Sequence, residues 1–194
     1  MARPAFARIE GSGVSMEPGQ SLAVLTAYKE VMEASWPTLH PDMVERSISW
    51  RRASDSDLAY ELAGYLAEAS MPDVTVRLFW KLGPRFAFAG ANTAFARDAG
   101  FANAQDLVGI DDFDPRLPWT HQAAKYRADD AEIVRSGQAK LDIIERQAQP
   151  GGVSWVRVGK APVRLISGAI LGLLGMYEIL DPDVGRKLYL DRLS

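Results

Sequence analysis

The chain contains no cysteine, which excludes disulfide bonds, thiolate metal sites, iron–sulfur clusters and cysteine nucleophiles. It also lacks a long apolar run. The most apolar window, Leu165 to Leu180, has only 16 residues and includes Glu178 and three glycines, whereas a membrane-spanning helix needs about 20 apolar residues. The first residues lack the continuous apolar core of a signal peptide. We therefore expect a cytoplasmic protein with no membrane partner, in which this window is a buried strand.

An excess of positive charge is missing as well. The 22 Lys and Arg residues are outnumbered by 25 Asp and Glu residues, and the formal net charge is −3. Since a nucleic-acid-binding domain typically concentrates positive charge, the sequence predicts no nucleic-acid partner. What is present is ordinary globular composition, with 47% hydrophobic and 24% charged residues. A length of 194 residues suits one domain with an appendage.

The N-terminal third differs in kind from the rest of the chain. Residues 1–20 are rich in Gly, Ser and Pro and predict a flexible tail. Residues 21–70 predict a helical extension with three helical patterns. The first pattern places an apolar stripe at Leu22, Leu25, Tyr28 and Met32. This stripe needs a covering surface, and its spacing suits a contact between two copies, so we expect a homodimer.

From residue 72 onward, β-branched and aromatic residues gather in short segments that predict strands. Five strands are expected, at residues 74–80, 85–89, 140–147, 153–163 and 169–180. Three helices are expected between the second and third strands, at residues 91–99, 104–108 and 118–135. This order predicts an α+β fold with an antiparallel sheet and helices gathered on one face. Residues 182–194 are expected to form a C-terminal tail.

The last expected strand is apolar on both faces. An antiparallel sheet with one solvated face alternates apolar with polar residues, so both faces of this sheet must be covered. We expect the helices of the domain on one face, and the N-terminal helices or a second subunit on the other. Trp155 is expected on this outer face, where an aromatic side chain needs a cover.

Seven short pieces follow one another from residue 79 to residue 179: FWK, ANTAFARDAGF, LVGIDDFD, LPW, KYRADD, WVRVGKAPV and GAILGLLGMYEI. As an ordered set, they resemble a PAS domain of the kind found in bacterial histidine kinases and other signalling proteins. The resemblance covers residues 72–181. It implies a five-stranded antiparallel sheet in the spatial order 2-1-5-4-3, with a cavity between the sheet and the long helix. Such domains bind small metabolites, haem or flavin, or bind nothing and serve as dimerisation modules.

We expect a small organic ligand in this cavity, in contact with Trp119, Tyr126, Asp130, Val156 and Tyr177, with His121 near the rim. The helix supplies aromatic walls, and Asp130 and the Tyr177 hydroxyl supply a few polar groups, as is usual for small-ligand sites. Gly175 lacks a side chain and is expected to leave room for the ligand. The alternative is that the aromatic residues are plain core and that Gly175 only eases the twist of the strand.

Three other kinds of chemistry have weaker support. Haem would take His121 as its axial ligand, but a single histidine near an amphipathic helix is weak evidence, so haem is disfavoured. Asp111, Asp112 and Asp114 suit a hard cation, but short acidic residues before a helix are usually caps, and we expect no metal. No catalytic motif is present, so we do not expect an enzyme. A buried Asp–His pair in an open cavity would reverse that view.

The sequence thus predicts a sensory PAS-domain protein that binds a small ligand and signals through protein–protein contact. The expected partners are a second copy of the chain and a separate signalling protein. The alternative is a ligand-free dimerisation or adaptor module, which a cavity filled with side chains would favour.

Overall fold

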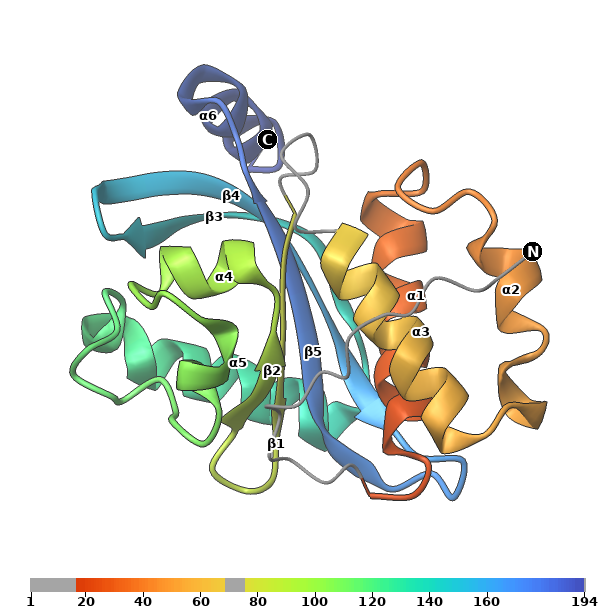
Figure 1. Cartoon of the computed structure of the whole chain (residues 1–194). Coiled ribbons are helices and arrows are strands. Elements are labelled where there is room, and N and C mark those ends of the chain that lie inside the picture. Colours follow the sequence, from red (N-terminus) through yellow and green to blue (C-terminus); the bar gives the residue numbers. More distant parts are fainter. Residues whose placement is uncertain (1–16, 69–75, 194) are drawn as a thin grey trace.

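The computed structural model describes residues 17–68 and 76–193. Residues 1–16 of the predicted flexible tail lie outside the described residues, as does the predicted start of the PAS domain at residue 72. The strands are β1 (Val76–Leu82), β2 (Ala87–Ala91), β3 (Lys140–Gln149), β4 (Gly152–Arg164) and β5 (Ile170–Ile179). The helices are α1 (Gln20–Ser35), α2 (Met43–Ser47), α3 (Asp55–Glu68), α4 (Thr93–Asp98), α5 (Ala123–Ser136) and α6 (Pro182–Asp191) (Figure 1). Short 3₁₀ turns are η1 (Trp50–Arg52), η2 (Ala104–Leu107) and η3 (Thr120–Gln122).

The five strands form one antiparallel sheet in the order β2-β1-β5-β4-β3. This confirms the α+β class and the spatial order that the resemblance implies. The central strand, β5, pairs Gly175 with Phe79 of β1 and Tyr177 with Val158 of β4. Because successive side chains of a strand point to opposite faces, β1, β4 and β5 each contribute to two separate cores.

The inner face of the sheet is covered by α4 and α5 (Figure 1). Asn92 caps α4, because its side chain accepts a hydrogen bond from the backbone N–H of Phe95 at 3.0 Å. At the other end of this layer, Gly137 adopts φ 67° and ends α5. The core between these helices and the sheet is rich in aromatic rings: Phe79, Phe86, Phe88, Phe95, Trp119, Tyr126 and Tyr177.

The outer face is covered by α1, with α3 packed beside it (Figure 1). A Cβ atom added to Gly159 of β4 would lie 2.6 Å from Cγ1 of Val31, so α1 approaches the sheet closely. The N-terminal helices therefore cover the outer face within the same chain. Leu25, Tyr28 and Met32 are at most 1% exposed in this core. The prediction that their stripe forms a dimer contact is wrong, since other residues of the same chain already cover it, including Tyr65 of α3 against Tyr28.

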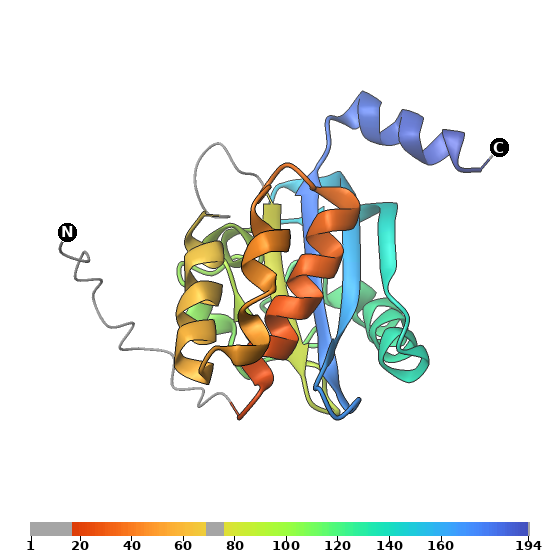
Figure 2. The ribbon, with the colours of Figure 1, turned by 90° about the vertical axis from the view of Figure 1, so that its right-hand side faces the viewer.

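The last helix, α6, lies beyond the end of the sheet, apart from both helical layers (Figure 2). Asp181 caps it by accepting hydrogen bonds from the backbone N–H groups of Asp183 and Val184 at 2.9 and 3.2 Å. Trp155 packs against Tyr189 of this helix, with ring centroids 5.2 Å apart. The expected cover for Trp155 is therefore supplied by α6 and not by the N-terminal helices. None of the helices in the described ranges is long and apolar enough to cross a membrane.

Candidate functional site

A small pocket lies between the inner face of the sheet and α5. Its volume is about 30 Å³, which is room for roughly two water molecules, since one needs at least about 10–15 Å³. The wall includes the apolar residues Phe79, Phe88, Phe95 and Val158 and the amphipathic aromatic residues Trp119, Tyr126 and Tyr177. The charged and amide residues at the pocket are Lys81, Asp112, Glu145, Gln147 and Lys160.

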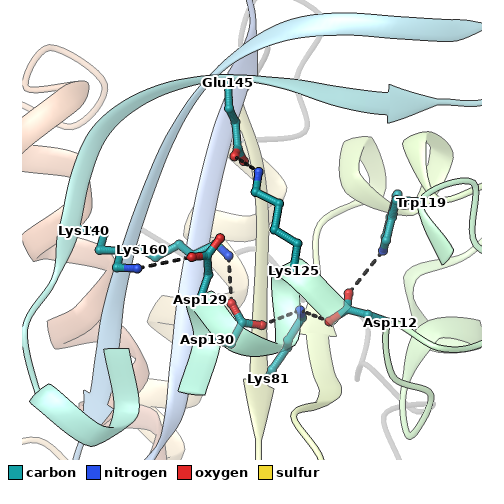
Figure 3. Close-up of polar contacts among 9 residues, drawn as sticks. All are labelled: Lys81, Asp112, Trp119, Lys125, Asp129, Asp130, Lys140, Glu145 and Lys160. Carbon is teal, nitrogen blue, oxygen red and sulfur yellow. Dashed lines mark hydrogen bonds and ion pairs between the residues drawn. The ribbon is translucent and has the colours of Figure 1, made fainter. Parts of the chain in front are cut away.

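Two lysines and two aspartates form a continuous ion-pair chain at this pocket (Figure 3). Lys81 on β1 donates to Asp112 at 2.6 Å and to Asp130 on α5 at 2.7 Å. Lys160 on β4 donates to the other carboxylate oxygen of Asp130 at 2.7 Å. We call these four residues the charged cluster. It joins two strands, the long helix and the loop before η3, so it fixes their positions relative to one another.

The charged cluster is buried, and burial alone would disfavour ionised groups. For Asp130, which is 0% exposed, the positive charges of Lys160 and Lys81 outweigh the effect of burial and hold the pKa below its ordinary value. For Lys160, burial lowers the pKa, but the charge of Asp130 outweighs it and leaves the pKa raised. Both groups are therefore ionised at neutral pH. The cluster holds two lysines and two aspartates, so its formal charges cancel.

The strand pattern explains how Lys81 reaches the interior. In β1, Leu78 and Trp80 lie in the outer core, whereas Phe79 and Lys81 face the pocket. The ammonium group of Lys81 lies 5.4 Å from the ring centroid of Phe79 and 5.0 Å from that of Phe88, which are cation–π distances. Aromatic faces and two carboxylates together replace the water that this ammonium group loses.

The rim of the pocket carries two further ion pairs (Figure 3). Lys125 of α5 donates to Glu145 of β3 at 3.0 Å, and Lys140 of β3 donates to Asp129 of α5 at 3.3 Å. Both pairs connect the helix to the edge strand and are partly exposed. Glu145 is also part of the pocket wall, so the Lys125–Glu145 pair borders the pocket.

The structure brings together four of the six residues predicted from the sequence. Trp119, Tyr126 and Tyr177 line the pocket, and Asp130 meets it through the charged cluster. Val156 is buried in the inner core but is not part of the pocket wall. His121 is exposed and lies outside the wall, so the expected position of this residue near the ligand is not observed.

Two expectations about the pocket need correction. A Cβ atom on Gly175 would lie 2.3 Å from Cζ of Phe79, so this glycine makes room for an aromatic ring and not for a ligand. The Tyr177 hydroxyl donates to Asp98 at 2.7 Å, and Asp98 also accepts from Arg77 at 2.8 Å. This hydroxyl therefore has a partner in α4 and does not need a ligand to satisfy it.

Sequence reasoning missed Lys81, Asp112 and Lys160. Asp112 was expected to be a cap, but it is 1% exposed and binds Lys81 and the indole N–H of Trp119, at 3.1 Å. The available signal was a lysine between apolar neighbours in a strand, Lys81 between Trp80 and Leu82 and Lys160 before Ala161. Within the described ranges, no group of three His, Cys, Asp or Glu side chains could hold a metal ion.

Several solved structures of signalling proteins are similar to this chain. A phage VqmA in complex with DPO aligns with a TM-score of 0.54 and 19% identity over 72% of this chain and 61% of VqmA. A Vibrio cholera VqmA–ligand–DNA complex aligns at 0.52 and 19% over 66% and 57% of the two chains. An RNA-binding light-oxygen-voltage receptor aligns at 0.50 and 22% over 70% and 37%. The chain thus spans less than two thirds of the length of each of these proteins.

A scan against protein-family models finds no match, and a search of curated proteins finds none either. The strand order and the structural similarities nevertheless agree. The chain has the PAS fold, with an additional N-terminal helical layer on the outer face of the sheet.

The prediction that excluded nucleic acid as a partner is wrong. One of the similar structures is a VqmA complex that contains DNA, and another is an RNA-binding receptor. Net charge was the wrong criterion, because a value summed over the chain does not describe a local surface, and local surfaces are what bind phosphates.

Proposed function

We propose that this chain is a non-catalytic sensory domain that binds a small molecule in the pocket between α5 and the sheet. The observation that supports this most is the charged cluster at the pocket. Small-ligand sites are mostly apolar with a few well-placed polar groups. A pocket with aromatic walls and ammonium and carboxylate groups at one end has this form.

The energetics of buried ion pairs support a role beyond stability. Replacing such a pair by well-packed apolar residues is often neutral or stabilising by about 1–4 kcal/mol, because desolvation opposes the attraction. The inner core is otherwise aromatic and aliphatic, so an apolar filling would suit it. We therefore infer that the four charged side chains at the pocket serve to bind the ligand.

The volume of the pocket, about 30 Å³, restricts the ligand. A molecule of about two non-hydrogen atoms fits without rearrangement, and a larger one requires the rim to open. The rim pairs Lys125–Glu145 and Lys140–Asp129 are partly exposed, and each exposed pair is worth only about 0–1 kcal/mol. Breaking the rim pairs therefore requires less free energy than breaking the ion pairs of the charged cluster.

A second candidate is a ligand-free adaptor, and the same volume favours it. Trp119 and Tyr126 fill much of the space between α5 and the sheet, and both have protein hydrogen-bond partners, Asp112 and Gln122. In this case the charged cluster would only fix the register of α5 on the sheet.

In either case the output is contact with another macromolecule. We propose a second copy of the chain, joined through a surface other than the buried α1 stripe, or a separate signalling partner, with nucleic acid among the candidates. Light scattering on the purified chain decides the first, because a dimer doubles the mass of 21.3 kDa.

Native mass spectrometry of the full chain tests the ligand. We expect a complex heavier than the protein by one small molecule, which is released on denaturation. Lys160→Met should abolish this species, whereas Lys125→Met, which changes an exposed lysine on the rim, should retain it. A protein that shows only its own mass from several expression hosts, and gains no mass from their small-molecule extracts, would support the ligand-free adaptor.

A further inference from the structure

We infer that the ligand of this pocket is an uncharged molecule that accepts hydrogen bonds from the Lys160 ammonium group. This inference rests on the proposed function and specifies the chemical class of the ligand. It follows from two properties of the described residues: which donors and acceptors remain unused, and how the charges add up.

The first property is an excess of donors. An ammonium group has three N–H donors, and among the described residues Lys160 uses one of them, on Asp130. Lys81 uses two, on Asp112 and Asp130. Two donors of Lys160 and one of Lys81 therefore have no protein acceptor in the described part of the chain. A ligand that satisfies them must present acceptor atoms such as carbonyl oxygen or ring nitrogen.

Gln147 adds a second polar contact. Its side chain is part of the pocket wall, is 8% exposed, and has no hydrogen-bond partner among the described residues. An amide offers both a donor and an acceptor, so it matches a ligand that carries both. Lys160 on β4 and Gln147 on β3 thus present hydrogen-bonding groups from neighbouring strands.

The second property is the absence of net charge. The two ammonium groups of the charged cluster are matched by two carboxylates, and Glu145 at the rim is matched by Lys125. An anion would have to enter a site where both ammonium groups are already neutralised. A cation would face the ammonium groups directly. Since a buried unmatched charge is strongly disfavoured, a neutral acceptor is the ligand class that fits.

Three molecules of nearly the same planar shape test this directly: acetamide, acetate and acetamidinium, with charges of 0, −1 and +1 at neutral pH. Each has four non-hydrogen atoms, so each enters the pocket with only a small opening of the rim. NMR titration of the full chain can follow the indole N–H of Trp119, which lines the pocket and binds Asp112. We expect acetamide to bind the unmodified protein about tenfold more tightly than either ion, because each ion would leave one unmatched charge in the buried site.

Two variants then shift the charge of the pocket in opposite directions. Lys160→Met leaves the cluster at −1, so acetamidinium should become the best of the three probes. Asp112→Asn leaves it at +1 with little change in shape, so acetate should become the best. Asp129→Asn, which changes a partly exposed pair with Lys140 outside the pocket wall, should leave acetamide first. Thermal melting of each variant shows whether it is folded before its binding is compared.

The outcomes separate this inference from the proposed function. If acetate or acetamidinium binds the unmodified protein best, the pocket is a ligand site but the inferred class is wrong. If a molecule extracted from the native complex is ionised at neutral pH, the class is wrong in the same way. If no probe moves the Trp119 signal and no complex is seen by mass spectrometry, the proposed function itself fails, and the inference fails with it.

Discussion

Asp129 and Asp130 are neighbours in α5 but lie in opposite surroundings. The side chain of Asp129 is 39% exposed and pairs with Lys140 at 3.3 Å. Asp130 is fully buried between two ammonium groups. The turn of the helix, about 100° per residue, separates the two carboxylates between the rim and the interior. The pair therefore offers a matched comparison of an exposed and a buried ion pair.

We expect Asp130→Asn to lower the free energy of unfolding by about 3–5 kcal/mol, because it leaves the charge of Lys160 buried without a counterion. Asp129→Asn should change it by at most about 1 kcal/mol, the range for exposed pairs. Urea unfolding followed by tryptophan fluorescence measures both. Equal effects of the two substitutions would show that the Asp130 carboxylate is not held in a desolvated site.

Gly175 gives a second residue-scale prediction. A methyl group on Gly175→Ala would overlap the Phe79 ring, which cannot move easily because it packs on Phe95 with centroids 4.6 Å apart. Overpacking of this kind costs about 1–3 kcal/mol. In contrast, Gly64 lies in the exposed surface of α3, and an added Cβ would meet nothing within 4 Å. Gly64→Ala should therefore stabilise the protein by up to about 1 kcal/mol.

Chemical denaturation of the two glycine variants checks this contrast. Phe79→Leu combined with Gly175→Ala should recover part of the lost stability, because the smaller side chain relieves the overlap. If Gly175→Ala is neutral on its own, the space beside Gly175 is larger than the contact with Phe79 indicates, and the earlier expectation of open room there would be restored.

At the scale of single elements, periodicity predicted most strands and helices because their patterns are local. Residues of α1 repeat at helical spacing, and β5 is apolar on both faces, which indicated cover on both sides. The charged cluster could not be found in the same way. Its hydrogen bonds join residues that are 30, 31 and 49 positions apart, so no local pattern connects a lysine to its aspartate.

The helix α6 gives a prediction at this scale. Gly185 is buried, and a Cβ there would lie 2.3 Å from Cβ of Trp155. Gly185→Ala should push α6 away from β4, while the capped helix and the rest of the sheet remain folded. Hydrogen exchange should then become faster in residues 182–191, with unchanged protection in β5. Lys187→Ala, at an exposed position of the same helix, serves as the control and should leave the exchange of α6 as it was.

The outcome for α6 also decides how rigidly the helix is attached. Exchange that is fast already in the unmodified protein, and unaffected by Gly185→Ala, would mean that the Trp155–Tyr189 contact does not hold the helix in solution. A helix that loosens on substitution would instead be a candidate route for passing a change in the sheet to a partner.

For the whole molecule, the sheet is the middle of three layers, with one core on each face. The resemblance to a PAS domain anticipated the sheet order and the inner layer. It carried no information about residues 1–70, whose place was inferred only from the apolar character of both faces of the last strand. In the structure, the helices of residues 1–70 that are described cover the outer face of the sheet in the same chain. A contact between two copies would therefore use another surface.

This arrangement makes the outer layer necessary for the PAS-fold part of the chain. Removing residues 1–70 would expose an apolar surface that α1 and α3 now cover, made of Val76, Leu78, Trp80, Ala161, Val163, Leu174 and Met176. Exposing one large apolar side chain to water destabilises the folded protein by about 1.5–3 kcal/mol, and an exposed patch of this kind promotes aggregation.

We expect the protein without residues 1–70 to be aggregated in light scattering or much less stable in thermal melting. Removing residues 182–194 is the control, because the main contacts of α6 are with β3 and β4 at one side of the sheet, and the remaining chain should keep its melting temperature within a few degrees. A chain without residues 1–70 that stays monomeric, soluble and equally stable would show that the outer face does not depend on the N-terminal helices.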